Sequence, residues 1–201
     1  SALTKPATRI AGLMLAAGQS RRFGSDKRVA LLPGGHTLLA TSLQRALGAF
    51  AQVALVLRAD DDAAELSVPE PVKVVRNANS QQGMASSLVV GIQALQSADI
   101  DAVAVLLADM PQMQPATFAA VAAMASPEHI VVPVYQGQRG HPVLFGRSFW
   151  SELMAVQGDA GARDVVRRYP AHVKVLTVQD PGVCIDVDDA AALACLSQQQ
   201  V

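Results

Sequence analysis

Residues 10–27 read IAGLMLAAGQSRRFGSDK and decide the fold that we expect. The first six, Ile10–Leu15, form a short apolar run that is typical of a buried strand. Small residues, two glycines and three cations follow it closely. In sheets of parallel strands, ligands bind outside the carboxyl ends of the strands, where such loops lie. The stretch therefore predicts an α/β fold with a binding loop after its first strand.

The rest of the chain repeats the alternation that residues 10–27 begin. Apolar runs of strand length lie at 53–57, 72–75, 102–107, 130–134, 173–178 and 183–187, and alanine-rich segments with helical spacing lie at 37–49, 84–96, 115–125, 160–169 and 189–196. This order predicts an α/β three-layer sandwich with a mostly parallel, Rossmann-like sheet. Without an internal repeat or a low-complexity linker, we expect one domain over residues 1–201.

Composition excludes several classes of protein. The 201 residues are 51% hydrophobic and 16% charged, which argues against a disordered chain. The formal net charge of −1 gives no electrostatic reason to expect a nucleic-acid or membrane-surface partner. Apolar runs stop short of the ~20 residues that a membrane-spanning helix needs.

The two cysteines, Cys184 and Cys195, have no cysteine or histidine at metal-ligand spacing. We expect free thiols rather than a disulfide, as in a reducing compartment. The N-terminal residues also lack the pattern of a secretory signal. These features predict a cytoplasmic protein.

The loop after the first strand has the chemistry of a phosphate site. Small side chains let backbone N–H groups approach an anion, and Arg21 and Lys27 can neutralise phosphate charge. The loop matches neither the Walker pattern nor GxGxxG. A glycine-rich turn with solvated cations is the simpler alternative, but the position after a strand favours phosphate binding.

Carboxylates follow two of the predicted strands. Asp109 follows the run at 102–107 after a single alanine, and a charged group in this position needs a partner. The alternative, a cap for the helix near 115, would require a later position. Asp186 and Asp188 fall on one face of the predicted strand at 183–187, where a cation would relieve their repulsion. Exposure at an edge strand is the alternative there.

Residues 76–88, RNANSQQGMASSL, form a polar loop that leads into a helix. Asparagine and glutamine amides both donate and accept hydrogen bonds, which suits recognition of a nucleobase. Gly83 and Ser86 lie where a helix N-terminus could meet an anion. An ordinary capped helix explains the composition equally well.

These motifs together resemble those of the MobA-like nucleotidyltransferases. LAAGxSxRxG followed by a lysine is similar to their signature, and the chain is most similar to the molybdenum cofactor cytidylyltransferases, because guanylyltransferase relatives usually read LAGG. ADMP at 108–111 resembles the family's GDMP, and DVDD at 186–189 resembles its D-I-D-T-P-E-D, in which Asp186 and Asp188 match while residues 189–191 depart from T-P-E. GQRGHPVLF at 137–145 and GDAGAR at 158–163 resemble the segments on the acceptor side. The polar loop departs from the family where Ser80 replaces a tryptophan.

The resemblance implies a fold of the nucleotide-diphospho-sugar transferase type and a set of site residues. Lys27, Arg21 and Asp109 would be catalytic, and Asp109 and Asp188 would bind Mg²⁺, with Mn²⁺ as an alternative. Asp186 is a second choice for the metal, and His141 is as often structural as functional. Nucleotide contacts would come from Leu15, Ala16, Ala17, Gly18, Gln19, Ser20, Arg21, Lys27, Asn77, Gly83 and Ser86.

The activity implied is transfer of CMP from CTP to molybdopterin with release of pyrophosphate. A molybdoenzyme of the xanthine dehydrogenase type would receive the product. One alternative keeps the chemistry and changes a substrate, to GTP, another nucleotide or a sugar phosphate. A second is a non-catalytic carrier or chaperone of a pterin cofactor, although such a binder needs no metal site beside a lysine.

Overall fold

A computed structural model describes residues 8–18, 25–158 and 161–185. Its strands are β1 (Ile10–Leu15), β2 (Gln52–Arg58), β3 (Lys73–Asn77), β4 (Ala102–Leu107), β5 (Ile130–Tyr135), β6 (Gln138–Arg139), β7 (Val143–Gly146) and β8 (Val173–Thr177). Its α-helices are α1 (Leu38–Ala49), α2 (Met84–Leu95), α3 (Pro115–Ala123), α4 (Trp150–Leu153) and α5 (Arg163–Arg168). Short 3-10 helices are η1 (Lys27–Val29), η2 (Ser80–Gln82), η3 (Arg147–Phe149), η4 (Pro170–His172) and η5 (Pro181–Cys184).

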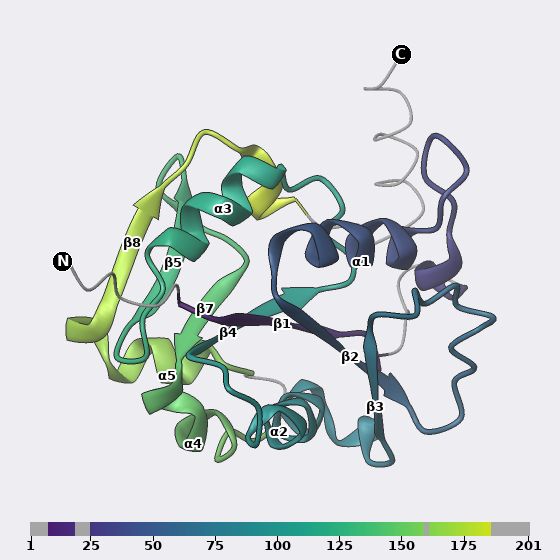
Figure 1. Cartoon of the computed structure of the whole chain (residues 1–201), viewed down its shortest axis with the longest axis horizontal. Coiled ribbons are helices and arrows are strands. Elements are labelled where there is room, and N and C mark those ends of the chain that lie inside the picture. Colours follow the sequence, from purple (N-terminus) through teal and green to yellow (C-terminus); the bar gives the residue numbers. More distant parts are fainter. Residues whose placement is uncertain (1–7, 19–24, 159–160, 186–201) are drawn as a thin grey trace, which may run out of the picture.

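In the described part of the chain, eight strands form one sheet in the order β3-β2-β1-β4-β7-β5-β6, with β8 paired to β5. Figure 1 shows α1 and α3 on one face of this sheet and α2, α4 and α5 on the other. The predicted α/β sandwich of three layers is confirmed. The sheet is mostly parallel, because β1, β2, β3 and β4 run in one direction and β5 pairs with β8 in parallel.

Strand β1 lies in the interior of the sheet and is apolar on both faces. It pairs in parallel with β2 on one side and β4 on the other. Its alternate side chains enter the two cores, so that Leu13 packs with α2 on one face and Met14 packs with α1 on the other. Gly12 is required by close packing, since a Cβ there would lie 2.9 Å from the ring of Phe50.

The antiparallel part of the sheet was not predicted. Strand β7 lies between β4 and β5 and runs antiparallel to both. It consists of residues that were assigned only to the GHPVLF motif, and β6 and α4 were likewise not expected. Helix α5 begins at Arg163 rather than at residue 160.

The strand predicted at 183–187 is wrong in its described part. Pro181–Cys184 instead forms η5, in which the Asp180 carboxylate accepts a hydrogen bond from the Gly182 amide. The β-branched alternation is overridden by this Asp-Pro-Gly turn. The argument that placed Asp186 and Asp188 on one face of a strand therefore has no support. Residues 186–188 and the helix predicted at 189–196 lie outside the described residues.

The carboxyl ends of β1, β3 and β4 meet at one edge of the sheet because the intervening strand pairs are all parallel. The loops that carry the sequence motifs therefore lie close together at this edge. Cys184 is a free thiol, and Cys195 is outside the described ranges. None of the helices in the described residues is long and apolar enough to cross a membrane.

Candidate active site

A cavity of about 850 Å³ opens at the carboxyl ends of β1 and β4. Its wall comes from the loop after β1, from η1, from η2 and the start of α2, and from the end of β4. The lining residues are Leu15, Ala16, Ala17, Gly18, Lys27, Arg28, Ser80, Gln81, Gly83, Met84, Ser87, Leu107, Ala108 and Asp109. Most of the described residues to which we assigned a nucleotide or metal role lie in this wall.

Lys27 and Asp109 form an ion pair across the cavity wall. The Lys27 ammonium lies 3.0 Å from Oδ2 of Asp109, and the two side chains are 23% and 18% exposed. Partial burial leaves both groups open to a ligand while it limits screening by water. A cation and a carboxylate thus lie side by side at the wall of the cavity.

The loop after β1 leaves the sheet at Ala16. The Ala16 amide still bonds to the carbonyl of Val56 in β2, as in a continued parallel strand. Its carbonyl accepts a hydrogen bond of 2.9 Å from Arg28 instead of one from a neighbouring strand. Ala17 and Gly18 then follow along the cavity wall.

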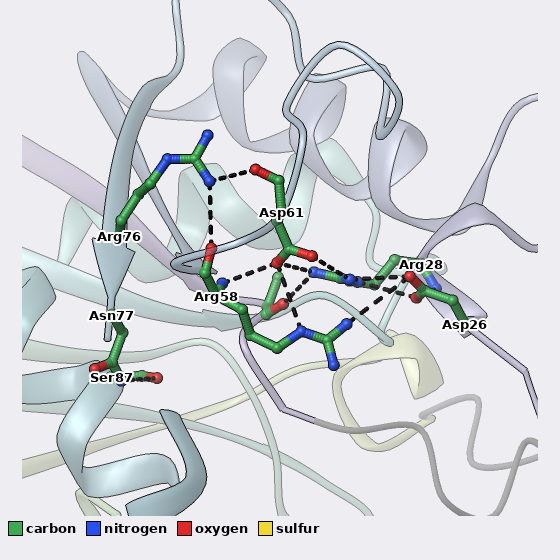
Figure 2. A network of polar contacts seen from close by, with 8 residues as sticks. Asp26, Arg28, Arg58, Asp61, Arg76, Asn77 and Ser87 are labelled. Atoms are coloured by element: carbon green, nitrogen blue, oxygen red, sulfur yellow. Dashed lines mark hydrogen bonds and ion pairs between the residues drawn. The ribbon is translucent and has the colours of Figure 1, made fainter. Parts of the chain in front are cut away.

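Arg28 is the centre of a network of charged groups beneath this loop (Figure 2). Its guanidinium bonds to both carboxylate oxygens of Asp26 and to both of Asp61. The hydrogen bonds from Arg28 hold the pKa of Asp26 below its usual 3.8. Burial raises the pKa of Asp61, but the bonds from Arg28 and Arg58 lower it by more. Burial opposes the charge on Arg28 itself, yet the two carboxylates raise its pKa overall.

Asn77 is buried and supports the polar loop from within. Its side-chain nitrogen donates to the hydroxyls of Ser86 and Ser87, and its side-chain oxygen accepts from the backbone N–H of Asn79. These bonds fix the course of the loop between β3 and α2. Asn77 and Ser86 are not part of the cavity wall, so the geometry gives them a supporting position rather than the nucleotide contact that we expected.

Ser80, Gln81, Met84 and Ser87 line the cavity in place of Asn77 and Ser86. The sequence drew attention to the loop at 76–88 because it is rich in amides and hydroxyls. It could not show which side chains face inward, because η2 turns the chain between Ser80 and Gln82. Gln81, whose amide can donate and accept, is therefore a better candidate than Asn77 for contact with a base.

Gly158 and Gly161 of the GDAGAR motif lie against the start of α2. The carbonyl of Gly158 accepts a hydrogen bond from the Ala85 amide. Gly161 has φ of +58°, and a Cβ there would lie 3.3 Å from the sulfur of Met84. One of the first amides of α2 is thus satisfied by the protein, which weakens the expectation that this helix end binds an anion.

His141 is mostly enclosed by the protein and senses the charges of Asp109 and Arg163. Its backbone amide donates to the Val183 carbonyl, whereas Nδ1 of its ring is buried without a hydrogen-bond partner among the described residues. Burial lowers the pKa of His141, the charge of Asp109 partly opposes this, and Arg163 adds to it. The imidazole is therefore neutral at pH 7.

Other predicted site residues, namely Gln19, Ser20, Arg21, Asp186 and Asp188, lie outside the described residues, and their roles stay predictions. Asp109 by itself fits one ligand position of a magnesium or manganese site, because it is a hard oxygen donor at the cavity wall. Within the described ranges, no three His, Cys, Asp or Glu side chains could hold a metal ion together. A metal here would need further oxygen ligands, such as those of a triphosphate.

The fold is the nucleotide-diphospho-sugar transferase fold, which this chain shares with solved nucleotidyltransferases. The chain is a nucleotidyltransferase of this class. It belongs to the family of the MobA-like NTP transferase domain, whose model matches residues 12–174. The resemblance read from the motifs is thereby confirmed.

Two curated relatives match almost the whole chain. Purine catabolism protein PucB of Bacillus subtilis is 29% identical over 189 residues, which are 88% of this chain and 90% of that protein. Nicotine blue oxidoreductase of Paenarthrobacter nicotinovorans is 29% identical over 190 residues, covering 89% and 92%.

Crystal structures of Rv0371c from Mycobacterium tuberculosis have the same fold. One is 30% identical with a TM-score of 0.79 and covers 95% of this chain and 99% of that one. A second, a complex with manganese, is 27% identical with a TM-score of 0.78 and covers 96% and 100%.

Proposed function

We propose that this protein transfers CMP from CTP to the phosphate of molybdopterin and releases pyrophosphate. The observation that carries the proposal is the ion pair of Lys27 and Asp109 in a cavity bounded by the loop after β1. Transfer of a nucleotidyl group asks a protein mainly to position two phosphates and to place cations where negative charge accumulates. The cavity has the residues for both tasks.

In this proposal an oxygen of the acceptor phosphate attacks the α-phosphorus of CTP. A new P–O bond forms, the bond from the α-phosphorus to the bridging oxygen breaks, and pyrophosphate leaves with that electron pair. The loop at 16–18 holds the triphosphate, and Lys27 and Arg21 offset its charge. No covalent enzyme intermediate is needed.

A divalent cation, Mg²⁺ or alternatively Mn²⁺, completes the proposed site. Asp109 and Asp188 would hold it, and when bound it neutralises charge on the triphosphate. The manganese complex of Rv0371c supports use of such an ion. Lys27, which contacts Asp109, would exchange part of this contact for the nucleotide.

The choice of CTP is supported by Ala17 and by the GDAGAR segment. Ala17 is 3% exposed and lies in the cavity wall, where the resemblance gives glycine to guanylyl relatives. Gly158 of the GDAGAR segment bonds to α2 next to that wall. The name of the relative PucB, a purine catabolism protein, agrees with delivery to a molybdoenzyme of the xanthine dehydrogenase type.

Two other readings remain as outcomes of the test. Another nucleotide or phosphorylated acceptor would use the same residues, and a pterin carrier would bind without turnover. The oxidoreductase name of the second relative points to redox chemistry in that protein. The loop after β1 lacks the GxGxxG fingerprint of dinucleotide-dependent enzymes, which argues against that chemistry at this site.

The test is pyrophosphate release with Mg²⁺ and each of CTP, GTP, ATP and UTP, with and without molybdenum-loaded molybdopterin. We expect release with CTP and only when the pterin is present. Release with GTP would show that Ala17 does not select the base. Pterin binding without release from any nucleotide would favour the carrier.

A further inference from the structure

Arg28 is a buried cation that the proposed reaction does not use. It is 5% exposed, and it lies next to Lys27 in η1 at the wall of the cavity. Burying a guanidinium is costly unless every side of it is paired. The hydrogen-bond partners of Arg28 therefore indicate which segments of the chain this side chain connects.

The partners of Arg28 come from two different loops. Asp26 precedes η1, and Asp61 lies in the loop that follows β2. Each carboxylate takes two hydrogen bonds from the guanidinium, of 2.9 and 2.9 Å to Asp26 and of 2.6 and 2.9 Å to Asp61. The loop after β2 is fixed in turn, because Oδ2 of Asp61 also accepts from the Arg58 amide at 2.8 Å.

A third strand end joins the same network. The guanidinium of Arg76, near the end of β3, donates to the backbone carbonyls of Arg58 and Asp61. Figure 2 shows Arg58 and Asp61 between Arg28 on one side and Arg76 on the other. The ends of β2 and β3 are thereby joined to Arg28, and Arg28 in turn contacts Ala16 just after β1.

The remaining contact of the Arg28 guanidinium is with the loop after β1. Its Nη1 atom donates to the carbonyl of Ala16, which is buried and has left the ladder of the sheet. Without this donor a buried carbonyl would have no partner, and the chain could turn it by rotating the peptide that leads to Ala17. Such a rotation would redirect the amides that follow.

We propose that Arg28 is a positioning residue for the nucleotide. Clamped between Asp26 and Asp61, it fixes the Ala16 carbonyl, and with it the direction of the amides at 17–18 and the position of Lys27. This inference rests on the proposed binding of a nucleoside triphosphate at the loop after β1. It requires arginine, because a lysine ammonium cannot bind two carboxylates and a carbonyl in one plane.

The experiment compares wild type with Arg28→Lys and with two controls. Val53→Ala removes buried volume at the start of β2, away from the cavity, and measures the effect of lost stability alone. Arg147→Lys repeats the same exchange at a surface arginine that donates to the carbonyls of Ala98 and Ile100, before β4. Each protein is titrated calorimetrically with Mg²⁺ and CTP, or with whichever of the four nucleotides wild type binds most tightly.

We expect Arg28→Lys to raise the Kd of the nucleotide by about 10- to 100-fold, the range for loss of charge-assisted hydrogen bonds. Hydrogen exchange of the amides at 15–18 should become faster in the nucleotide-free protein. Both controls should bind within about twofold of wild type. Where turnover is seen, the KM for the nucleotide should rise while the KM for the acceptor stays unchanged.

Asp61→Asn keeps the test decisive if Arg28→Lys fails to fold. It weakens one side of the clamp, so it should raise the Kd of the nucleotide less than Arg28→Lys does. In the variant that carries both substitutions, the two effects on the Kd should not add. The proposal is overturned if both Arg28→Lys and Asp61→Asn bind like wild type, if Val53→Ala weakens binding equally, or if wild type binds none of the nucleotides. Nucleotide binding without transfer to molybdopterin would overturn only the proposed function.

Discussion

The ammonium nitrogen of Lys27 lies 3.0 Å from Oδ2 of Asp109, although the two residues are 82 positions apart in the sequence. The pairing of β1 with β4 explains this contact, since Leu15 and Leu107 are partners in the last register position of the two strands. The chain segments that follow the two strands therefore start next to each other. A lysine after one strand and an aspartate after the other meet at the cavity.

Replacing Lys27 with methionine tests what this pair does. The variant keeps most of the side-chain volume but removes the charge that would face the triphosphate, so kcat/KM for the nucleotide should fall by about 10²- to 10³-fold. Pyrophosphate release under steady-state conditions measures the loss. Lys73→Met is the matched control, because Lys73 bonds to the Ala94 carbonyl on the surface and should give wild-type rates. Equal rates for Lys27→Met and Lys73→Met would exclude an electrostatic role for Lys27.

The sequence predicts the parallel half of the fold closely. β1 and β4 match the expected runs residue for residue, because strands covered on both faces are continuously apolar. β7 escaped prediction because a run of four residues inside a motif has no period of its own. The strand prediction at 183–187 fails in its described part because Asp180 turns the chain there despite the alternation of apolar residues.

The candidate site was predictable only in part, for a similar reason. Lys27, Asp109 and the loop at 16–18 follow strands, and ligands bind at the carboxyl ends of parallel strands. Arg28 and Asp61 carry no comparable signal, because their pairing depends on how two loops fold back over the sheet. Asn77 looked like a ligand-binding amide, yet the same hydrogen-bonding capacity serves the loop around it.

His141 should make stability depend on pH. Burial holds its pKa below the usual 6.5, with Arg163 acting in the same direction and Asp109 against it. The unfolded chain gains a proton near pH 6.5 and the folded protein only at lower pH. The contribution of neutral His141 to the free energy of unfolding is therefore fully present above pH 6.5. It declines as the pH falls from 6.5 toward the pKa of His141 in the folded protein.

Urea unfolding at several pH values between 7.5 and about 5.5 checks this expectation. The midpoint of wild type should fall toward the acid end, and that of His141→Asn should fall less. His36→Asn, at an exposed histidine, serves as the control and should behave like wild type. A wild-type midpoint that is independent of pH would contradict the neutral, buried state of His141.

Asp180 holds the segment after β8 to the start of α3. It is 4% exposed, and its carboxylate accepts hydrogen bonds of 2.7 to 2.8 Å from the backbone N–H of Gln114, the hydroxyl of Thr117 and the backbone N–H of Gly182. Asp180→Asn places an NH₂ group against donors and should reduce the free energy of unfolding by about 2–4 kcal/mol. Thr117→Val removes one donor and should cost about 1 kcal/mol. Urea unfolding gives both values, and an Asp180→Asn loss no larger than that of Thr117→Val would contradict a shared acceptor.

Gly140 and Gly48 provide a pair of substitutions with opposite expected signs. A Cβ on Gly140 would lie 2.3 Å from the backbone carbonyl oxygen of Val183, so Gly140→Ala must push η5 away from the loop before β7. That shift should also break the bond from the His141 amide to Val183 and reduce stability by about 3 kcal/mol or more. Gly48 is exposed in α1, and apart from its chain neighbours and the backbone of its own helix no described atom lies within 4 Å of the position of its Cβ. Gly48→Ala should therefore raise the free energy of unfolding by about 0.5–1 kcal/mol through helix propensity and lower chain entropy. Thermal and urea unfolding of both variants measure the difference, and a Gly140→Ala protein as stable as wild type would mean that η5 does not rest on Gly140.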